Sequence, residues 1–380
     1  MTDQENLTTE DTVIVDKPIK PRRKFYHKRF WLIFVMVIVM GLAVNLLLPQ
    51  IKALENSWNV VKNLTWWALG LAALGQVGFY FFAGYMIHSI LDANNQKMSI
   101  FKGALIYMAS FSIGLVAGGW VTGAAATVGW VRNENRDGQT ALLAGALPPL
   151  LLNAGLIGLA LLGILYLLLI HDLTQGQLIQ YLIYLSILSV ITFGELAALR
   201  YPKVATKVGI WIASRWAKLF HKSFDPQRIE DKMAQLVLVW HSLRGGRWLR
   251  PLLGALGVLA SDMFTVFFMF LAAGYTLNPG TLLAGYSLPI LLGKVIFLFP
   301  GGIGLVEVTM VALFGNLTKQ SQISLVGTLG YRLFSFWIPT ILGFVAAGYL
   351  SRHNFKRPKK HLDHKKKPSD TPADPTVFQV

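Results

Sequence analysis

The sequence predicts an all-α polytopic membrane protein, with about eight transmembrane helices, two broken or re-entrant hairpins and an inverted repeat. The first observation is composition: of 380 residues, 54% are hydrophobic and only 14% are charged, whereas soluble domains carry about 25% charged residues. The second is that apolar residues form runs of about 20 or more, long enough for a helix to cross a hydrocarbon core of roughly 30 Å. The third is that Lys and Arg crowd into the segments beside these runs, as the positive-inside rule requires.

Most of the apolar runs are continuous and are predicted to cross the membrane once. They cover residues 30–48, 64–91, 141–170, 178–199, 249–273 and 323–350. Two further runs are interrupted by residues that break helices. The run at 101–130 is broken by Gly118 and Gly119, and the run at 281–317 by Pro300, Gly301, Gly302 and Gly304.

The basic linker between the fourth and fifth continuous runs decides how the broken runs are interpreted. Residues 200–250 hold eleven Lys and Arg against three acidic residues, so we expect this linker in the cytoplasm, together with both termini. A single crossing at 101–130 would put the linker outside, whereas a hairpin keeps it inside. The second arm of 281–317 has about 14 residues, or roughly 21 Å, which is short for a full span. A re-entrant hairpin is therefore predicted for both broken runs, with a pair of crossings as the alternative for the second.

The two halves of the chain superpose with an offset of about 182 residues, and each begins with one extra helix. Because the first half starts inside and the second starts outside, this is the pattern of an inverted repeat, whose sites lie where broken helices meet near the midplane. A chance match of hydropathy patterns is the alternative. The chain is predicted to begin with a disordered cytoplasmic N-tail at 1–29 and to end with a disordered basic C-tail at 353–380. Between them lie a first membrane half at 30–199, a cytoplasmic amphipathic linker at 200–248 and the remainder of the second membrane half at 249–352. The second half itself begins with the helix at 178–199, before the linker.

The linker is predicted to contain two helices. In the first, Val208, Ile212 and Trp216 form an apolar stripe with Lys and Arg around the other side, which is typical of a basic helix at a membrane interface. The second is predicted to start at Asp225 as its N-cap and to stop at Gly245.

Charged side chains inside apolar runs are the candidates for chemistry, because each costs about 2.5–3.5 kcal/mol on insertion scales. The candidates are Glu195, Asp262, Lys294, Glu307 and Arg332. The glycines after Pro300 let backbone amides approach a ligand and start a short helix whose N-terminus favours an anion, with phosphate as the natural fit. The predicted lipid-binding residues are Gly301, Gly302, Gly304, Glu307, Arg332, Lys294 and Asp262.

Structural interpretations of the same charges remain open. Glu307 and Arg332 can form a buried ion pair that only fixes the register of the helices. Glu195 lies near the cytoplasmic end of its run and can extend its carboxylate into water. Asp262 lies in the middle of its run and has no obvious partner in the sequence.

Several classes of function are excluded or disfavoured. The chain has no cysteine, so thiol nucleophiles and thiolate metal sites are excluded. The glycine-rich turn lacks the Lys-Ser/Thr of a P-loop and the Rossmann spacing. No catalytic constellation, metal site or cofactor is predicted. The basic residues that give the chain its net charge of +16 lie beside apolar runs. The expected partner is therefore acidic lipid rather than nucleic acid.

One motif carries a family resemblance. The segment Phe299-Pro300-Gly301-Gly302-Ile303-Gly304-Leu305-Val306-Glu307, followed by Tyr331-Arg332-Leu333 and Phe336-Trp337-Ile338-Pro339, resembles the signature of the membrane domain of the bacterial lysylphosphatidylglycerol synthase/flippase family. The hydropathy match covers residues 30–350, and the motif covers the last quarter of that region. The first half departs from the expected pattern, with Gly118-Gly119-Trp120 and later Val131-Arg132.

The resemblance implies a flippase-like lipid translocase for phospholipids such as aminoacylated phosphatidylglycerol, which modifies membrane surface charge and gives resistance to cationic antimicrobial peptides. In the full-length members it resembles, a separate soluble domain transfers lysine from charged tRNA, and we expect this chain to lack that domain. The alternatives are a phosphatidylglycerol lysyltransferase that acts with a soluble aminoacyl-transferase partner, and a membrane scaffold or regulator. The expected location is the plasma membrane, and a homo-oligomer is possible.

Overall fold

The computed structural model describes residues 57–117, 119–135, 138–171, 174–219, 225–227, 230–231, 234, 245–295 and 302–355. Every regular element in these ranges is a helix, which confirms the all-α class. Five of the described helices are long and apolar enough to cross a membrane, and the chain is a polytopic membrane protein. The predicted span at 30–48, most of the second linker helix and the tail after 355 lie outside the described residues.

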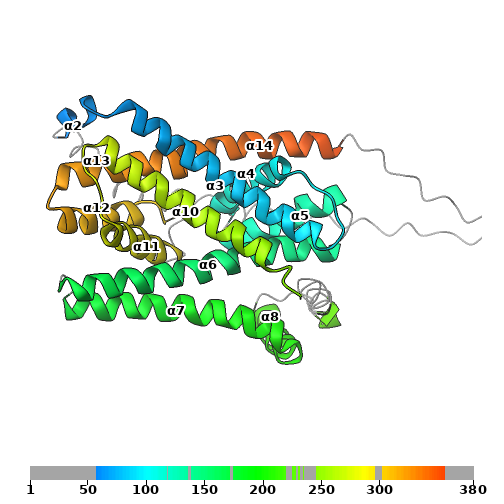
Figure 1. Ribbon diagram of the computed structural model, residues 1–380. Coiled ribbons are helices and arrows are strands. Elements are labelled where there is room, and N and C mark those ends of the chain that lie inside the picture. The colour runs from blue at the N-terminus through cyan, green and yellow to red at the C-terminus, as the bar shows by residue number, and fades with distance from the viewer. Residues whose placement is uncertain are drawn as a thin grey trace, which may run out of the picture.

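The long helices run side by side along the length of the bundle (Figure 1). They are α3 (Trp66–Asp92), α6 (Gly138–Leu169), α7 (Gln175–Arg200), α10 (Leu249–Ala272) and a final rod made of α13 (Ser321–Arg332), the π-helix η2 (Leu333–Trp337) and α14 (Ile338–Phe355). Each predicted broken run is a pair of shorter helices: α4 (Ile100–Ala117) with α5 (Trp120–Asn135), and α11 (Pro279–Val295) with α12 (Leu305–Thr318). The other two named helices of the described residues are the short α2 (Trp58–Lys62) and the linker helix α8 (Pro202–Leu219).

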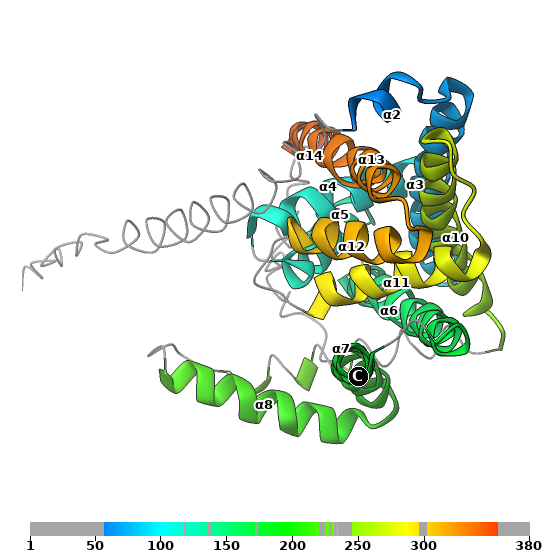
Figure 2. The ribbon, with the colours of Figure 1, turned by 90° about the vertical axis from the view of Figure 1, so that its left-hand side faces the viewer.

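Hydrogen bonds fix which segments share an end of the bundle. At the linker end, Arg250 Nη1 lies 2.9 Å from Asp92 Oδ2, which joins the start of α10 to the end of α3. At the opposite end, which we call the far end, the Thr65 backbone N–H donates to the Ala272 carbonyl over 3.0 Å, and the Tyr166 hydroxyl donates to Asn278 Oδ1 over 3.2 Å. The α4–α5 pair lies toward the linker end and the α11–α12 pair toward the far end (Figure 1), and Figure 2 shows the bundle from the far end. Each pair leaves and returns at one end, as the sequence predicts.

Glycines let the two arms of the first hairpin lie in contact. Gly119 adopts φ +87° in the turn, and its N–H donates to the Gly114 carbonyl over 2.7 Å. A Cβ added at Gly114 would lie 3.2 Å from the Cα of Gly123 on the other arm. Small residues at such positions allow helix backbones to approach closely, which stabilises pairs in lipid.

The crossing of α3 and α10 shows the twofold repeat most directly. A Cβ added at Gly75 would lie 3.1 Å from the ring of Phe264, and one added at Gly257 would meet the ring of Phe82. Gly257 lies 182 positions after Gly75, and Phe264 lies 182 positions after Phe82. This is the offset that the hydropathy pattern predicts. A matched pair of contacts of this kind is what the predicted inverted repeat requires at this crossing.

The hairpins are held by the long helices of the opposite half. On α6, a Cβ added at Gly163 would lie 2.9 Å from the Cα of Ala284 on α11. On α14, the Thr340 carbonyl accepts a hydrogen bond of 3.0 Å from the Ser112 hydroxyl of α4. Each hairpin therefore packs against elements from both halves. The second hairpin in this way lies against the bundle interior.

Candidate functional site

The strongest polar feature of the described bundle is an ion pair between the end of α13 and the start of α12. Arg332 Nε lies 2.6 Å from Glu307 Oε1. Glu307 is fully buried and Arg332 is 5% exposed. A buried pair of this kind is costly to break, because the remaining charge is left without a partner in a medium of low dielectric constant.

Glu307 is positioned by the N-terminus of α12. It is the third residue of the helix, and its Oε2 accepts a hydrogen bond of 2.7 Å from the Gly304 N–H. One carboxylate oxygen therefore caps the helix while the other binds Arg332, and the positive end of the helix dipole adds to the stabilisation of the carboxylate. Gly304 adopts φ +83°, a conformation that glycine takes without a steric cost.

Arg332 is held from a second side by an aromatic ring. Its guanidinium carbon lies 4.3 Å from the centroid of the Phe336 ring. Phe336 belongs to η2, where the Ile338 N–H donates to the Leu333 carbonyl five residues earlier. Pro339 follows directly and has no N–H to donate. Single π-helical turns inside longer helices occur frequently at functional sites.

Asp262, on α10, is the second buried carboxylate, and its partners come from three other helices. Its Oδ1 accepts a hydrogen bond of 2.9 Å from Gln76 of α3. Its Oδ2 accepts from the Tyr286 hydroxyl of α11 over 3.0 Å and from the Tyr331 hydroxyl of α13 over 2.9 Å. The sequence predicts no partner for Asp262, because its donors are neutral side chains far away along the chain.

The two carboxylates belong to one buried polar cluster, which we call the acidic cluster: Gln76, Asp262, Tyr286, Tyr331, Arg332 and Glu307. Tyr331 and Arg332 are neighbours on α13, so the residue that donates to Asp262 is next to the one that pairs with Glu307. Among its described members the cluster holds two carboxylates and one guanidinium. An acidic side chain buried in a membrane bundle, beyond the one that pairs with the guanidinium, is the kind of feature that marks the path of a cationic group or a proton.

The other predicted site residues lie outside this cluster. Lys294 is exposed, and its ammonium lies 2.7 Å from Asn153 Oδ1 of α6. Gly302 adopts φ +70° and packs tightly, because a Cβ there would lie 2.5 Å from a methyl group of Val306. Gly301 and the side chain of Glu195 lie outside the described residues. The phosphate site predicted at the glycines thus stays a prediction.

The residues that the structure describes contain no group of three or more His, Cys, Asp or Glu side chains able to hold a metal ion. The acidic cluster is instead suited to binding charged groups by ion pairs and hydrogen bonds. In this conformation the Arg332 guanidinium is occupied by Glu307 and Phe336.

Comparison with known proteins identifies the family. A 153-residue stretch is 29% identical to UPF0104 membrane protein PH1989 of Pyrococcus horikoshii, covering 37% of this chain and 44% of that protein, so the match spans less than half of the relative's length. The model of the lysylphosphatidylglycerol synthase TM region matches residues 29–343. This range contains α3 through the first part of α14, with both hairpins and the whole acidic cluster. The chain therefore belongs to the lysylphosphatidylglycerol synthase TM region family.

Proposed function

We propose that this protein translocates phospholipids across the membrane and that aminoacylated phosphatidylglycerol, whose headgroup carries both a phosphate and an ammonium, is the kind of lipid it takes. The observation that carries the proposal is the acidic cluster, which joins helices of both halves beside a broken helix. Discontinuous helices at the interface of inverted repeats are where transporters bind their substrates. Membership of the TM region family supports the same conclusion.

The ion pair in the cluster suggests how a headgroup is accepted. A lipid phosphate would take the place of Glu307 on Arg332, and the ammonium of the headgroup would take the place of Arg332 on Glu307. Each charge then keeps a partner at every stage, which avoids the penalty for an unpaired ion in the bilayer. Asp262 contributes the extra negative charge that favours a cationic headgroup over an anionic one.

The acyl chains have an apolar surface to follow while the headgroup moves. Ile179, Leu182 and Ile183 of α7 are exposed, and so are Leu161 and Leu165 of α6. These side chains form the lipid-facing surface of a membrane helix in a bundle whose polar groups point inward. Such a division lets the chains remain in the bilayer.

The orientation of the bundle is part of the proposal. We place the linker end in the cytoplasm, because it holds the basic residues of the linker, such as Lys203, Lys207 and Arg215, whereas the described far end holds Lys62 and Lys319. The chain has no cysteine, so single substitutions can be labelled without background. A thiol at Lys207 should react only in permeabilised cells and one at Asn278 in intact cells. The opposite pattern would reverse the orientation.

The test of function is lipid movement in liposomes that contain the purified protein. The fraction of a fluorescent aminoacylated phosphatidylglycerol that a membrane-impermeant quencher can reach should rise faster than in protein-free liposomes. Glu307→Gln and Arg332→Gln should each abolish this movement. Because either change alone can also prevent folding, thermal stability is measured on the same preparations.

The double variant Glu307→Gln/Arg332→Gln separates chemistry from folding. It removes both ions, so it should recover much of the stability that each single change loses. A stable and inactive double variant supports a role for the pair in translocation. A stable double variant that moves lipid as fast as the wild type excludes these residues as the headgroup site and favours a structural role.

A further inference from the structure

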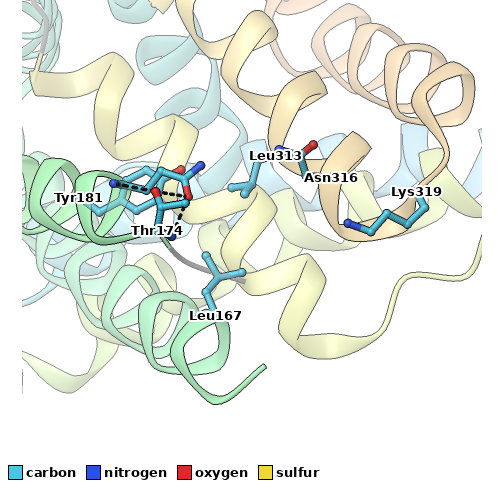
Figure 3. A pocket seen from close by; sticks show the side chains of 7 residues that line it. Leu167, Thr174, Tyr181, Leu313, Asn316 and Lys319 are labelled. Atoms are coloured by element: carbon cyan, nitrogen blue, oxygen red, sulfur yellow. Dashed lines mark hydrogen bonds between the residues drawn. The ribbon is translucent and has the colours of Figure 1, made fainter. Parts of the chain in front are cut away.

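A second polar site lies at the far end of the bundle, separate from the acidic cluster. It is a pocket of about 280 Å³ between the start of α7 and the end of α12, and Leu167 at the end of α6 forms part of its wall (Figure 3). Thr174, Gln177 and Tyr181 line one side, and Leu313, Asn316 and Lys319 line the other. The pocket is therefore lined by both apolar and polar side chains.

The polar groups that line the pocket are mainly hydrogen-bond donors without partners. The Gln177 Oε1 accepts from the backbone N–H and the hydroxyl of Thr174 over 3.1 and 3.0 Å, which leaves the amide NH₂ of Gln177 available. Within the described residues, neither the Asn316 amide nor the Lys319 ammonium makes a hydrogen bond, and no acidic side chain lines the pocket. Three donor groups, one of them a cation, suit an anion with several oxygen atoms.

Lys319 is placed for this role by an uncommon backbone conformation. It follows the last residue of α12 with φ 57°, in the left-handed region where helices usually end in glycine. A lysine at this position bears a conformational cost that glycine would not. Figure 3 shows its side chain reaching back toward Thr174 and Tyr181 across the pocket.

The surroundings of the pocket favour a lipid over a free ion. Leu168 and Ile170, close to Leu167 at the end of α6, are exposed. A phospholipid whose acyl chains lie along this end of α6 has its phosphate at the pocket, where Gln177 and Lys319 lie. A pocket lined by polar groups beside exposed apolar side chains therefore fits a phospholipid with an anionic headgroup.

We infer that this pocket is a second lipid site, which holds the phosphate of an anionic phospholipid in the leaflet at the far end. The inference deepens the proposed function, since it places a binding step at one end of the translocation path. Lys319 supplies the charge, Asn316 and Gln177 supply neutral donors, and Leu167 and Leu313 contact the glycerol and upper acyl carbons.

Two substitutions test the site with little effect on the fold. Lys319→Gln removes the charge. Gln177→Glu keeps the oxygen that Thr174 needs for the helix cap but replaces the free donor with a second, negatively charged oxygen. Gln180→Glu is the matched control, because Gln180 lies on the same helix, binds Tyr184 and does not line the pocket. Lys62→Gln is the control for loss of a cation at the same end.

The measurement is native mass spectrometry of the purified protein, which compares retention of phosphatidylglycerol with that of phosphatidylcholine carrying the same acyl chains. The wild type should prefer phosphatidylglycerol, and Lys319→Gln and Gln177→Glu should each lower that preference by about tenfold, the change expected for one charge-assisted hydrogen bond. Both controls should keep the wild-type preference. Equal retention of phosphatidylglycerol by the pocket variants and the controls would overturn the inference.

Two further measurements distinguish a lipid from free phosphate as the ligand, and failure of this inference from failure of the proposed function. If millimolar inorganic phosphate displaces phosphatidylglycerol from the wild type, the site takes free phosphate and the assignment to lipid is wrong. Translocation is measured on the same preparations. A wild type that moves no lipid but retains phosphatidylglycerol through Lys319 would disprove the proposed function and leave this site standing.

Discussion

The two halves of the bundle share a fold but differ in the polarity of their interiors. At an offset of 182 residues, Glu307 corresponds to Ala125, Arg332 to Leu150 and Asp262 to Tyr80. The α3–α10 crossing is nevertheless built from matched contacts in the two halves. Small and apolar residues are thus sufficient for the repeated architecture, and the acidic cluster is an addition to one half.

The ion pairs formed by the two hairpins show the same difference, one within the first hairpin and one between the second hairpin and α13. In the first half, Lys102 Nζ lies 2.5 Å from Glu134 Oε1, with side chains 36% and 19% exposed. In the second half, the side chains of Arg332 and Glu307 are 6% and 0% exposed. The two distances are similar, so solvent exposure decides how much each pair contributes to stability and how much its loss costs.

The largest expected effect comes from breaking the buried pair. Glu307→Gln should destabilise the protein by roughly 3–5 kcal/mol, because Arg332 loses its carboxylate partner in the interior. Lys102→Gln in the first hairpin should cost no more than about 1 kcal/mol. Thermal and denaturant unfolding in detergent measure both. Equal losses in the free energy of unfolding would mean that the burial of the two ion pairs does not decide how much each contributes to stability.

A smaller effect is expected at the turns of the hairpins. Gly302→Ala should cost roughly 2–4 kcal/mol, since it combines a left-handed backbone with a Cβ 2.5 Å from a Val306 methyl group. Gly119 has a similar φ, but a Cβ there meets nothing within 4 Å. Gly119→Ala should therefore cost only the backbone strain, about 1 kcal/mol. The same unfolding assay compares them, and a larger loss at Gly119 would contradict the packing described for the second turn.

The smallest difference is expected where the halves are most alike. Gly75→Ala and Gly257→Ala each place a methyl group into the α3–α10 crossing. The first meets the Thr265 hydroxyl at 2.5 Å and the Phe264 ring at 3.1 Å, and the second meets the Phe82 ring at a still shorter distance. Each should cost about 1–3 kcal/mol from overpacking, and the two losses should be similar. A clear destabilisation by one and none by the other would show that the twofold relation does not extend to the packing of this interface.

Much of the architecture could be predicted because hydropathy and helix breakers act locally. The predicted run at 249–273 corresponds to α10, and the breaks at Gly119 and around Gly302 separate the arms of the two hairpins. The pairing of Glu307 with Arg332 was one of two interpretations that the sequence offered, since opposite charges in apolar surroundings seek each other. The structure shows that pairing, and a role in translocation stays a proposal.

The partners of Asp262 could not be predicted, because Gln76, Tyr286 and Tyr331 carry no charge and lie 186, 24 and 69 positions away. The far-end pocket was missed for a similar reason. It is made by a loop after α12 and a helix start on α7 that meet only in the folded bundle. The Thr174 and Gln177 spacing of a capping box was the one signal in the sequence that marked this helix start.

The central claim is that the acidic cluster of the second half moves lipid. The most direct measurement compares Asp262→Asn with Tyr80→Phe, because Tyr80 occupies the position in the first half that corresponds to Asp262. Both variants are placed in liposomes, and the rate of transfer of aminoacylated phosphatidylglycerol is measured after their folding is checked. The Tyr80 hydroxyl makes no hydrogen bond within the described residues. The account predicts that Asp262→Asn falls to the rate of protein-free liposomes while Tyr80→Phe keeps most of the wild-type rate. A folded Asp262→Asn protein that moves lipid at the wild-type rate would contradict it.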